Sequence, residues 1–175
     1  MDSPHSAFAA FGRVTARIAA CEQIMRLALG EREVERAKRN GDAAQERFQR
    51  FSQRMLRWDF GQLSQRVRTQ LKLPEDPWVQ IFKDAKELRN GVAHNFWSPY
   101  YALLQSDEGI DIIIRHCNTL DRYFEHLTSI LIHATGVNIN LYMEFISTKD
   151  WKFNTKKDFD RVLRIAEDAI ADLPD

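Results

Sequence analysis

Apolar residues recur at spacings of three and four along most of this chain, a periodicity that predicts amphipathic helices. The first apolar face covers residues 8–29, and the polar run after it extends the predicted helix to residue 39, where Asn40-Gly41 turns the chain. The second face covers residues 44–71, with Gly61 as a candidate kink inside one helix. The N-terminal part of the chain therefore predicts two long helices.

Two further helices are predicted between residues 77 and 135. Asp76 suits the N-cap of the third helix, and Pro77 suits its first position because a missing N–H costs nothing there. This helix should end before Ser98-Pro99, and a loop over residues 106–109 leads to the fourth helix, which Gly136 closes. The positions expected to face inward are Trp78, Ile81, Phe82, Ala85, Leu88 and Val92, followed by Ile112, Ile113, Cys117, Leu120, Phe124, Leu127 and Leu131.

The C-terminal region has a weaker pattern. Residues 137–141 alternate as a strand does, whereas residues 142–146 fit a helical turn, so both alternatives stay open. A last helix is expected from Thr155, with Asp158 three residues later as a partial capping box.

These elements predict a single all-α domain over residues 1–175. It is an antiparallel four- to five-helix bundle with a core over about residues 8–135 and a C-terminal helical extension over 136–175. Hydrophobic residues make up 44% and charged residues 29%, as in a soluble globular protein. No run approaches the ~18 apolar residues that span a bilayer, and the start shows no signal-peptide pattern. Cys21 and Cys117 are too few for a disulfide framework, so we expect unpaired thiols, a cytoplasmic location and no membrane partner.

Charge is balanced overall but unevenly distributed. The chain has 25 basic and 25 acidic residues, yet residues 1–72 hold 14 Lys and Arg against 8 Asp and Glu. This asymmetry fits either a local nucleic-acid surface or two oppositely charged faces that contact each other. Within the basic part, four arginines at helical spacing form either an RNA-binding track or a solvated helix face. They are Arg47, Arg50, Arg54 and Arg57.

The end of the third predicted helix carries the strongest chemical signal, Leu88-Arg89-Asn90-Gly91-Val92-Ala93-His94. Arg89 supplies a permanent planar cation suited to a phosphate, and His94 supplies an imidazole, a side chain that can transfer protons. In an ideal α-helix these two residues lie about 140° apart around the axis, whereas Asn90 and His94 share one stripe. One protomer makes a poor site from them unless the helix unwinds near Gly91. A two-fold homodimer solves this problem, because one copy's arginine can lie beside the other's histidine.

This string, followed by Asn95-Phe96, resembles the R-x4-6-H motif of HEPN domains, in which the residue after the arginine is commonly polar, as Asn90 is. The upstream Asp59-Phe60-Gly61-Gln62-Leu63 also resembles a segment of bacterial members, and the likeness covers about residues 43–135. The resemblance implies a dimeric helical bundle. For many members it implies a metal-independent endoribonuclease in a toxin–antitoxin, CRISPR-linked or abortive-infection defence system.

Carried over to this chain, the resemblance assigns catalysis to Arg89, Asn90 and His94. His94 would act on the 2′-hydroxyl or the leaving 5′-oxygen, Arg89 would hold the scissile phosphate, and Asn90 would orient one of the two. RNA is then the substrate, a 2′,3′-cyclic phosphate the product, and an antitoxin or neighbouring defence protein an expected partner. Some members have a tyrosine two residues after the histidine that a nucleotidyltransferase modifies. This chain has Phe96 there, so that form of control does not carry over.

Each candidate also has a structural interpretation. Arg89 and His94 can complement a helix C-terminus, and some HEPN members are inactive interaction modules. The alternative function is therefore a non-catalytic module that binds RNA, a nucleotide or a partner protein. Trp97, Tyr100 and Tyr101 either stack on bases or close the open end of the bundle.

The remaining chemistry-bearing residues favour packing. His116, His126 and His133 fall on the fourth predicted helix without a carboxylate or cysteine that completes a metal site, and Cys117 falls on its apolar face. There is no glycine-rich phosphate loop and no nucleophile elbow. We therefore expect no metal and no cofactor.

Overall fold

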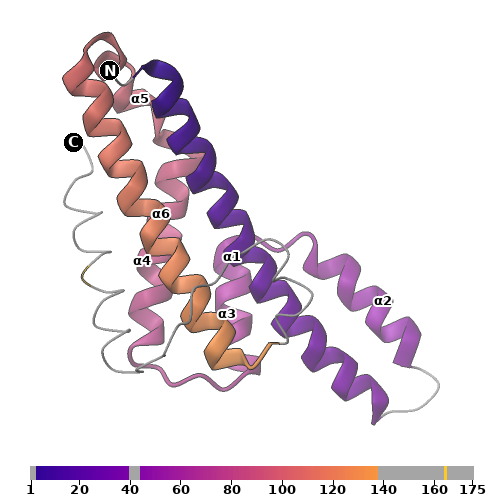
Figure 1. Cartoon of the computed structure of the whole chain (residues 1–175). Helices are drawn as coiled ribbons and strands as arrows, with labels where there is room; N and C mark the ends of the chain where they lie inside the picture. Colours follow the sequence, from indigo (N-terminus) through magenta and orange to yellow (C-terminus); the bar gives the residue numbers. More distant parts are fainter. Residues whose placement is uncertain (1–2, 40–43, 138–163, 165–175) are drawn as a thin grey trace.

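The structure is a computed structural model that describes residues 3–39, 44–137 and 164, and these residues are mostly helical, with no strand among them (Figure 1). The expected all-α bundle is confirmed. The elements expected after residue 137 lie outside the described residues. In chain order the helices are α1 (Pro4–Lys38), α2 (Ala44–Met55), α3 (Phe60–Gln70), α4 (Trp78–Asn90), the π-helical turn η2 (Gly91–Asn95), α5 (Trp97–Tyr100), the 3-10 helix η3 (Ala102–Gln105) and α6 (Asp107–Thr135).

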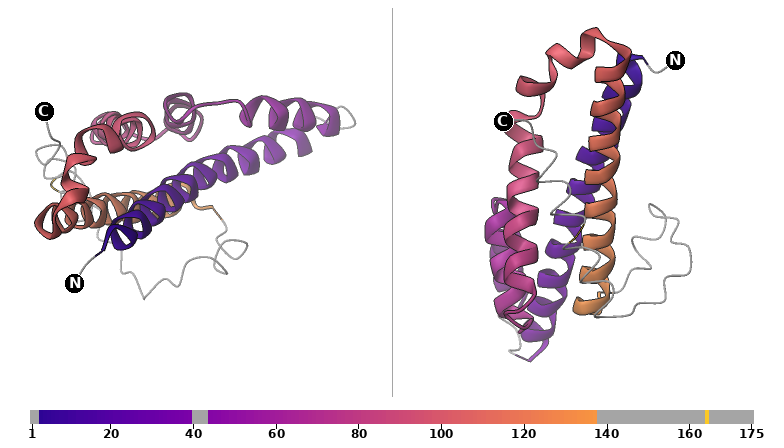
Figure 2. Two further views of the ribbon diagram at one scale, coloured as in Figure 1. Left: turned by 90° about the horizontal axis from the view of Figure 1, so that it is seen from above. Right: turned by 90° about the vertical axis from the view of Figure 1, so that its left-hand side faces the viewer.

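Helices α1 and α6 lie side by side and run in the same direction through the bundle (Figures 1 and 2). The contacts between them advance together along both helices. Arg13 Nη2 donates to Asn118 Oδ1 over 3.3 Å, and Arg17 Nε donates to Asp121 Oδ1 over 3.1 Å. Consecutive long helices alternate in direction, so α4 runs antiparallel to both (Figure 1).

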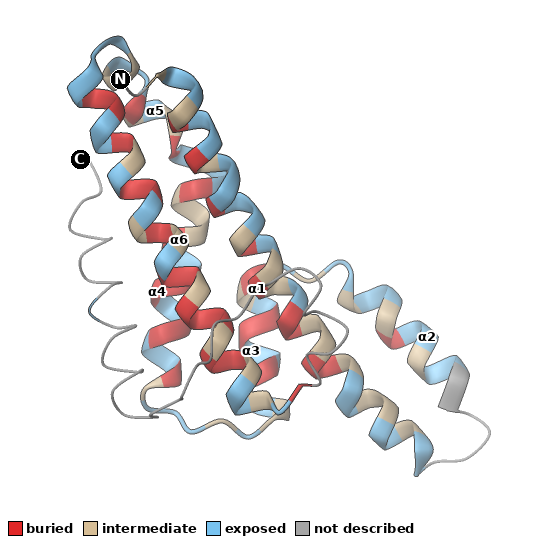
Figure 3. Cartoon of the chain, viewed as in Figure 1, coloured by how far each residue is buried: buried red, intermediate tan, exposed pale blue. Residues whose placement is uncertain are grey.

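The core lies between α1, α3, α4 and α6 (Figure 3). All six positions expected to face inward from the third predicted helix are buried, and Tyr123 of α6 donates a 3.1 Å hydrogen bond to the Ile81 carbonyl of α4. Ile112 is an exception to the predicted pattern, because its side chain is 37% exposed. The largest fully buried side chains are Tyr123, Phe60, Phe124, Ile24, Met25, Leu29, Leu63, Ile81, Leu88, Ile113, Leu120 and Leu127.

The second predicted helix is two helices, and the break precedes Gly61. Helix α2 ends at Met55, and α3 begins at Phe60 with Asp59 as its N-cap. Asp59 Oδ1 accepts from the Gln62 N–H over 2.7 Å, and Gln62 Oε1 accepts from the Asp59 N–H over 3.3 Å. This capping box satisfies the first-turn donors and starts a new helix, which is why the expectation of one kinked helix was wrong.

The ends of the third predicted helix also differ from expectation. Helix α4 begins at Trp78, so Pro77 is its N-cap residue and Asp76 is not, and the Glu75 carbonyl accepts the Val79 N–H over 2.8 Å. At the other end, helical turns continue through η2 into α5 and include Ser98-Pro99. Pro99 lies in the first turn of α5, where its missing N–H is tolerated.

Helix α6 starts within the expected loop, because the Ser106 side chain accepts the Gly109 N–H over 3.1 Å and caps the helix. Its predicted end is confirmed, with Gly136 in the left-handed conformation at φ 65°. None of the described helices combines the length and apolar character needed to cross a membrane.

Helix α2 packs along the C-terminal half of α1, and this pair extends away from α4 and α6 (Figures 1 and 2). The bundle therefore has two separate surfaces of interest, one on α4 and η2 and the other on α2.

Candidate functional site

The helix that carries the arginine and histidine changes its winding between them. Helix α4 ends at Asn90, and residues Gly91–Asn95 form the π-helical turn η2. Pro99 follows this turn and has no N–H to donate to the Asn95 carbonyl, which favours an interruption of regular α-helix before it. A π-turn bonds residues five apart, so Arg89 and His94 are separated by less than the roughly 140° of an ideal α-helix. The local unwinding near Gly91 that a single-protomer site requires is thus present.

Arg89 is held in place by two neighbours. Its Nε donates to Glu22 Oε1 of α1 over 3.3 Å, and its Nη1 donates to the Asn90 side-chain oxygen over 3.4 Å. A guanidinium has five N–H donors, so three of them have no partner among the described residues. The Arg89 side chain is 26% exposed, and these remaining donors suit a phosphate that approaches from solvent.

Glu22 joins Arg89 to a second arginine. Its other oxygen, Oε2, lies 3.3 Å from Nη2 of Arg26, which also donates to the Trp58 carbonyl over 3.4 Å. The Glu22 and Arg26 side chains are only 15% and 17% exposed. Each Glu22 carboxylate oxygen binds a different arginine. Glu22 therefore orients Arg89 through Nε and leaves the Nη atoms of Arg89 to other partners.

His94 stands apart from this network. Its side chain is exposed and forms no hydrogen bond or ion pair with another described residue. Asn90 is half-buried, one helical turn before it on the same stripe. The structure therefore brings Arg89 and Asn90 into contact, while His94 presents its ring to solvent nearby.

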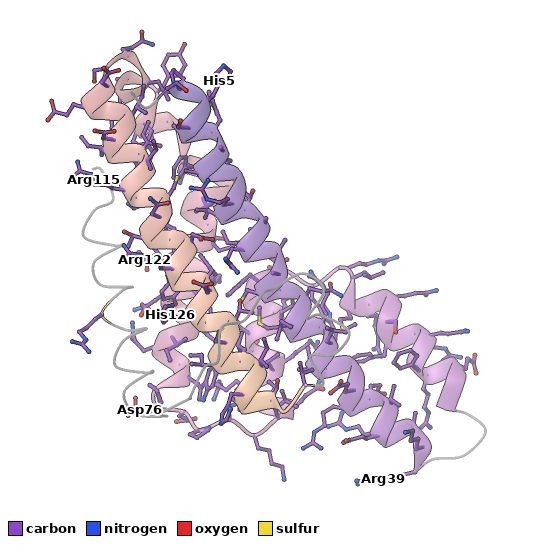
Figure 4. All side chains as sticks on the ribbon, viewed as in Figure 1. His5, Arg39, Asp76, Arg115, Arg122 and His126 are labelled. Carbon is purple, nitrogen blue, oxygen red and sulfur yellow. The ribbon has the colours of Figure 1, made fainter. Side chains whose placement is uncertain are left out.

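The arginine stripe, on α2 and the turn that follows it, forms a different surface. All four of its arginines are exposed, and with Glu33 and Gln53 they line a hollow of about 530 Å³ between α1 and α2. Arg50 forms an ion pair with Glu46. The long side chains of α2 project from the α1–α2 pair, away from α4 (Figure 4). The stripe and the motif are thus not parts of one pocket.

The aromatic residues after His94 mostly close the bundle. Tyr100 is 2% exposed, and Phe96 is 5% exposed with its ring 4.6 Å from that of Tyr100. Trp97 packs on Phe11 with a ring separation of 5.0 Å, whereas Tyr101 is 69% exposed. Of the three aromatics proposed to stack on bases, Tyr101 is therefore the most exposed to solvent.

The histidines and cysteines of the core make no site. His116 and His126 are buried and His133 is exposed, and no group of three metal-ligating side chains lies together among the described residues. Both thiols are free and buried, as expected, and burial raises the pKa of Cys21 and of Cys117 to about 12. A thiol that stays protonated at neutral pH is a poor nucleophile, so both cysteines belong to the packing.

Sequence reasoning missed Glu22. Its pairing with Arg26 at a spacing of four is readable from the sequence, but its partner Arg89 lies 67 positions away, beyond any local pattern.

Comparison with known proteins adds no further constraint: no family model, curated protein or solved structure matches this chain.

Proposed function

We propose that the protein is a metal-independent endoribonuclease of the HEPN type. The observation that carries the proposal is the anchored Arg89 guanidinium, close along the helix to an exposed His94, with three N–H donors that no described residue binds. A fixed cation stabilises the charge that develops on a phosphate, and a solvent-facing imidazole can exchange protons with substrate and water.

The chemistry is an internal transesterification of RNA. The 2′-oxygen attacks the adjacent phosphorus and loses its proton, the bond from phosphorus to the 5′-oxygen breaks, and the 5′-oxygen gains a proton. The products are a 2′,3′-cyclic phosphate and a 5′-hydroxyl. His94 transfers a proton at one of the two oxygens, Arg89 binds the phosphate, and Asn90 orients Arg89 through its side-chain oxygen.

We further propose that the site is composite. In a two-fold homodimer built on α4 and η2, one copy's Arg89 flanks the other copy's His94, which supplies the base and the cation on both sides of one phosphate. The α2 arginines form a second basic surface that contacts the RNA away from the scissile bond. We place the enzyme in the cytoplasm, in a bacterial toxin or anti-phage defence system with an antitoxin or neighbouring defence protein as partner.

The test is RNA cleavage in the presence of EDTA. Wild type should cleave, His94→Ala should not, and the matched variant His5→Ala should cleave as wild type does, because His5 is an exposed histidine on the first turn of α1 (Figure 4). Cleavage that is unchanged in His94→Ala would contradict the assignment.

One observation favours a second function, a non-catalytic binding module. The Glu22 carboxylate partly neutralises Arg89 in the free protein, as in a purely structural ion pair. RNA binding by wild type with no cleavage under any of these conditions would favour the module.

A further inference from the structure

The face of α4 that carries Asn90 and His94 also carries two lysines that the motif does not include. Lys83, Lys86 and Asn90 follow one another at spacings of three and four, and His94 comes four residues later. Residues at these spacings lie on one face of a helix. Both lysines and His94 are exposed and Asn90 is half-buried, so both ends of the face are open to solvent.

These lysines border a hollow of about 510 Å³ between α3 and α4. Arg68 of α3 is the third basic residue that lines this hollow. The rest of the lining is neutral except for one carboxylate, and consists of Asp59, Gly61, Gln62, Ser64, Gln65, Val79 and Phe82. A groove with several cations, amides and an apolar floor fits a nucleic-acid strand, which presents phosphates, sugars and bases.

The lining of this groove carries three cations, Lys83, Lys86 and Arg68, against one carboxylate, Asp59, and a further carboxylate, the exposed Glu87, lies beside the lysines on α4. Asp59 already accepts a 2.7 Å hydrogen bond from the Gln62 N–H as the N-cap of α3. Glu75 lies 3.7 Å from Arg68 but is 88% exposed, and such surface pairs interact weakly. Neither Lys83 nor Lys86 forms an ion pair with another described residue. The α2 stripe differs, because Arg50 there is paired with Glu46.

Lys86 also links the two walls of the groove. A Cβ atom at Gly61 would lie 3.3 Å from Lys86 Cε, so the lysine stem lies across the first turn of α3. The absence of a side chain at Gly61 leaves room for this stem, which keeps the ammonium group at the groove.

We infer that the groove between α3 and α4 binds a single-stranded stretch of RNA and leads it along α4 to His94. The axial distance from Lys83 to His94 is roughly 16 Å at 1.5 Å per residue, which spans a short run of nucleotides. A single strand fits better than a duplex, because attack by the 2′-oxygen requires a nucleotide free to turn its 2′-hydroxyl in line with the leaving oxygen. This inference rests on the proposed ribonuclease function and names its substrate as single-stranded RNA.

The groove is compatible with the proposed dimer. Charged residues are depleted from the buried centres of protein interfaces, so the lysine-bearing half of α4 belongs outside the interface centre. A two-fold axis near η2 then leaves one such groove on each protomer leading to the shared site.

The test measures binding without cleavage. The probe is a labelled 2′-O-methyl uridine oligonucleotide, which lacks the attacking hydroxyl, and fluorescence anisotropy follows its binding over a range of salt concentrations. We expect Lys83→Ala/Lys86→Ala to weaken binding about tenfold or more. The slope of log K against log salt is negative, and it should become shallower by about 1.4, since each phosphate contact on a single strand contributes about 0.7. The control is Lys38→Ala/Arg39→Ala, which removes the same charge at the far end of α1 (Figure 4) and should change binding less than about twofold.

Equal effects of the two double variants, or no effect of Lys83→Ala/Lys86→Ala, would overturn the inference whatever the cleavage assay shows. Tighter binding to the same sequence annealed into a duplex would also overturn it. Loss of binding in the groove variant, in a protein that never cleaves RNA, would support the groove and reject the proposed ribonuclease.

Discussion

The Glu22 carboxylate of α1 orients the Arg89 guanidinium of α4, with Glu22 Oε1 3.3 Å from Arg89 Nε. This contact joins two helices that are distant in sequence, and it uses Nε, the arginine donor nearest the aliphatic stem. The second Glu22 oxygen is committed to Arg26. Arg89 is thus oriented through Nε, and its Nη2 donors have no partner among the described residues and suit a phosphate.

Glu22→Gln should therefore impair cleavage more than binding. An amide cannot hold two arginines with two charged oxygens, so Arg89 loses its fixed orientation, and misplacement of a catalytic group lowers rates by roughly tenfold to a hundredfold. We expect kcat to fall by about tenfold, with little change in affinity for a 2′-O-methyl oligonucleotide. Glu35→Gln on the same helix, where the carboxylate pairs with Arg32 at the surface, is the control and should be neutral. A faster Glu22→Gln enzyme would show instead that the carboxylate competes with phosphate.

Arg89→Lys should not restore function. Arg89 uses Nε for Glu22 and Nη1 for Asn90 and has further donors for a phosphate, whereas an ammonium is a point charge without a fork. We expect both Arg89→Lys and Arg89→Ala to lose cleavage by about a hundredfold or more, with weaker RNA binding in Arg89→Ala. Thermal melts provide the folding control. Wild-type cleavage by Arg89→Lys would remove the guanidinium from the proposed mechanism.

The sequence predicted the helical class because apolar spacing is a local property, and the buried faces of α4 and α6 follow it closely. It misjudged the junction between α2 and α3, where the capping box of Asp59 and Gln62 overrides a continuous apolar stripe. It identified Arg89, Asn90 and His94 as candidates but not Glu22 or the groove lysines. Those residues are brought to the candidate site and the groove by the packing of α1 and α3 against α4, and no spacing within one helix specifies such contacts.

The oligomeric state gives an independent test of the composite site. The π-turn reduces the angle between Arg89 and His94 within one protomer, whereas the composite site that we propose takes the arginine beside His94 from a second copy. We expect light scattering to show a homodimer at micromolar concentration. Mixing inactive Arg89→Ala with inactive His94→Ala should then restore part of the activity, since a mixed dimer retains one intact site. A monomer at all concentrations would contradict this prediction.

Stability should decline in alkaline solution because of the two buried thiols. Burial raises the pKa of Cys21 and of Cys117 from 9.0 to about 12, so the folded protein keeps thiols protonated that the unfolded chain ionises. Their contribution is complete below pH 9 and is lost as the pH rises from 9 toward 12. At pH 10 the loss for Cys21 is on the order of 1 kcal/mol.

Urea denaturation between pH 8 and about 11 measures this loss. Cys21→Ala/Cys117→Ala should be less stable at pH 8 but should show a shallower decline above pH 9. Burial also raises the pKa of Tyr123 well above 10, so part of the decline should remain in the double variant. An identical decline in both proteins would show that the thiols are not responsible.

Two glycines in helices should respond to alanine in opposite directions. At Gly109, on the first turn of α6, a Cβ atom would lie 2.1 Å from the Leu103 carbonyl oxygen of η3, which is far inside van der Waals contact. Gly109→Ala must therefore displace backbone, and we expect it to lower the free energy of unfolding by about 3 kcal/mol. At Gly30, within α1, a Cβ atom would meet no atom within 4 Å. Gly30→Ala should raise the free energy of unfolding by up to about 1 kcal/mol, because alanine restricts the unfolded chain and favours helix. Urea denaturation of both variants checks this pair. The contact at Gly109 also fixes the turn between α5 and α6, so a fully stable Gly109→Ala protein would mean that η3 does not approach α6 as closely as the structure shows.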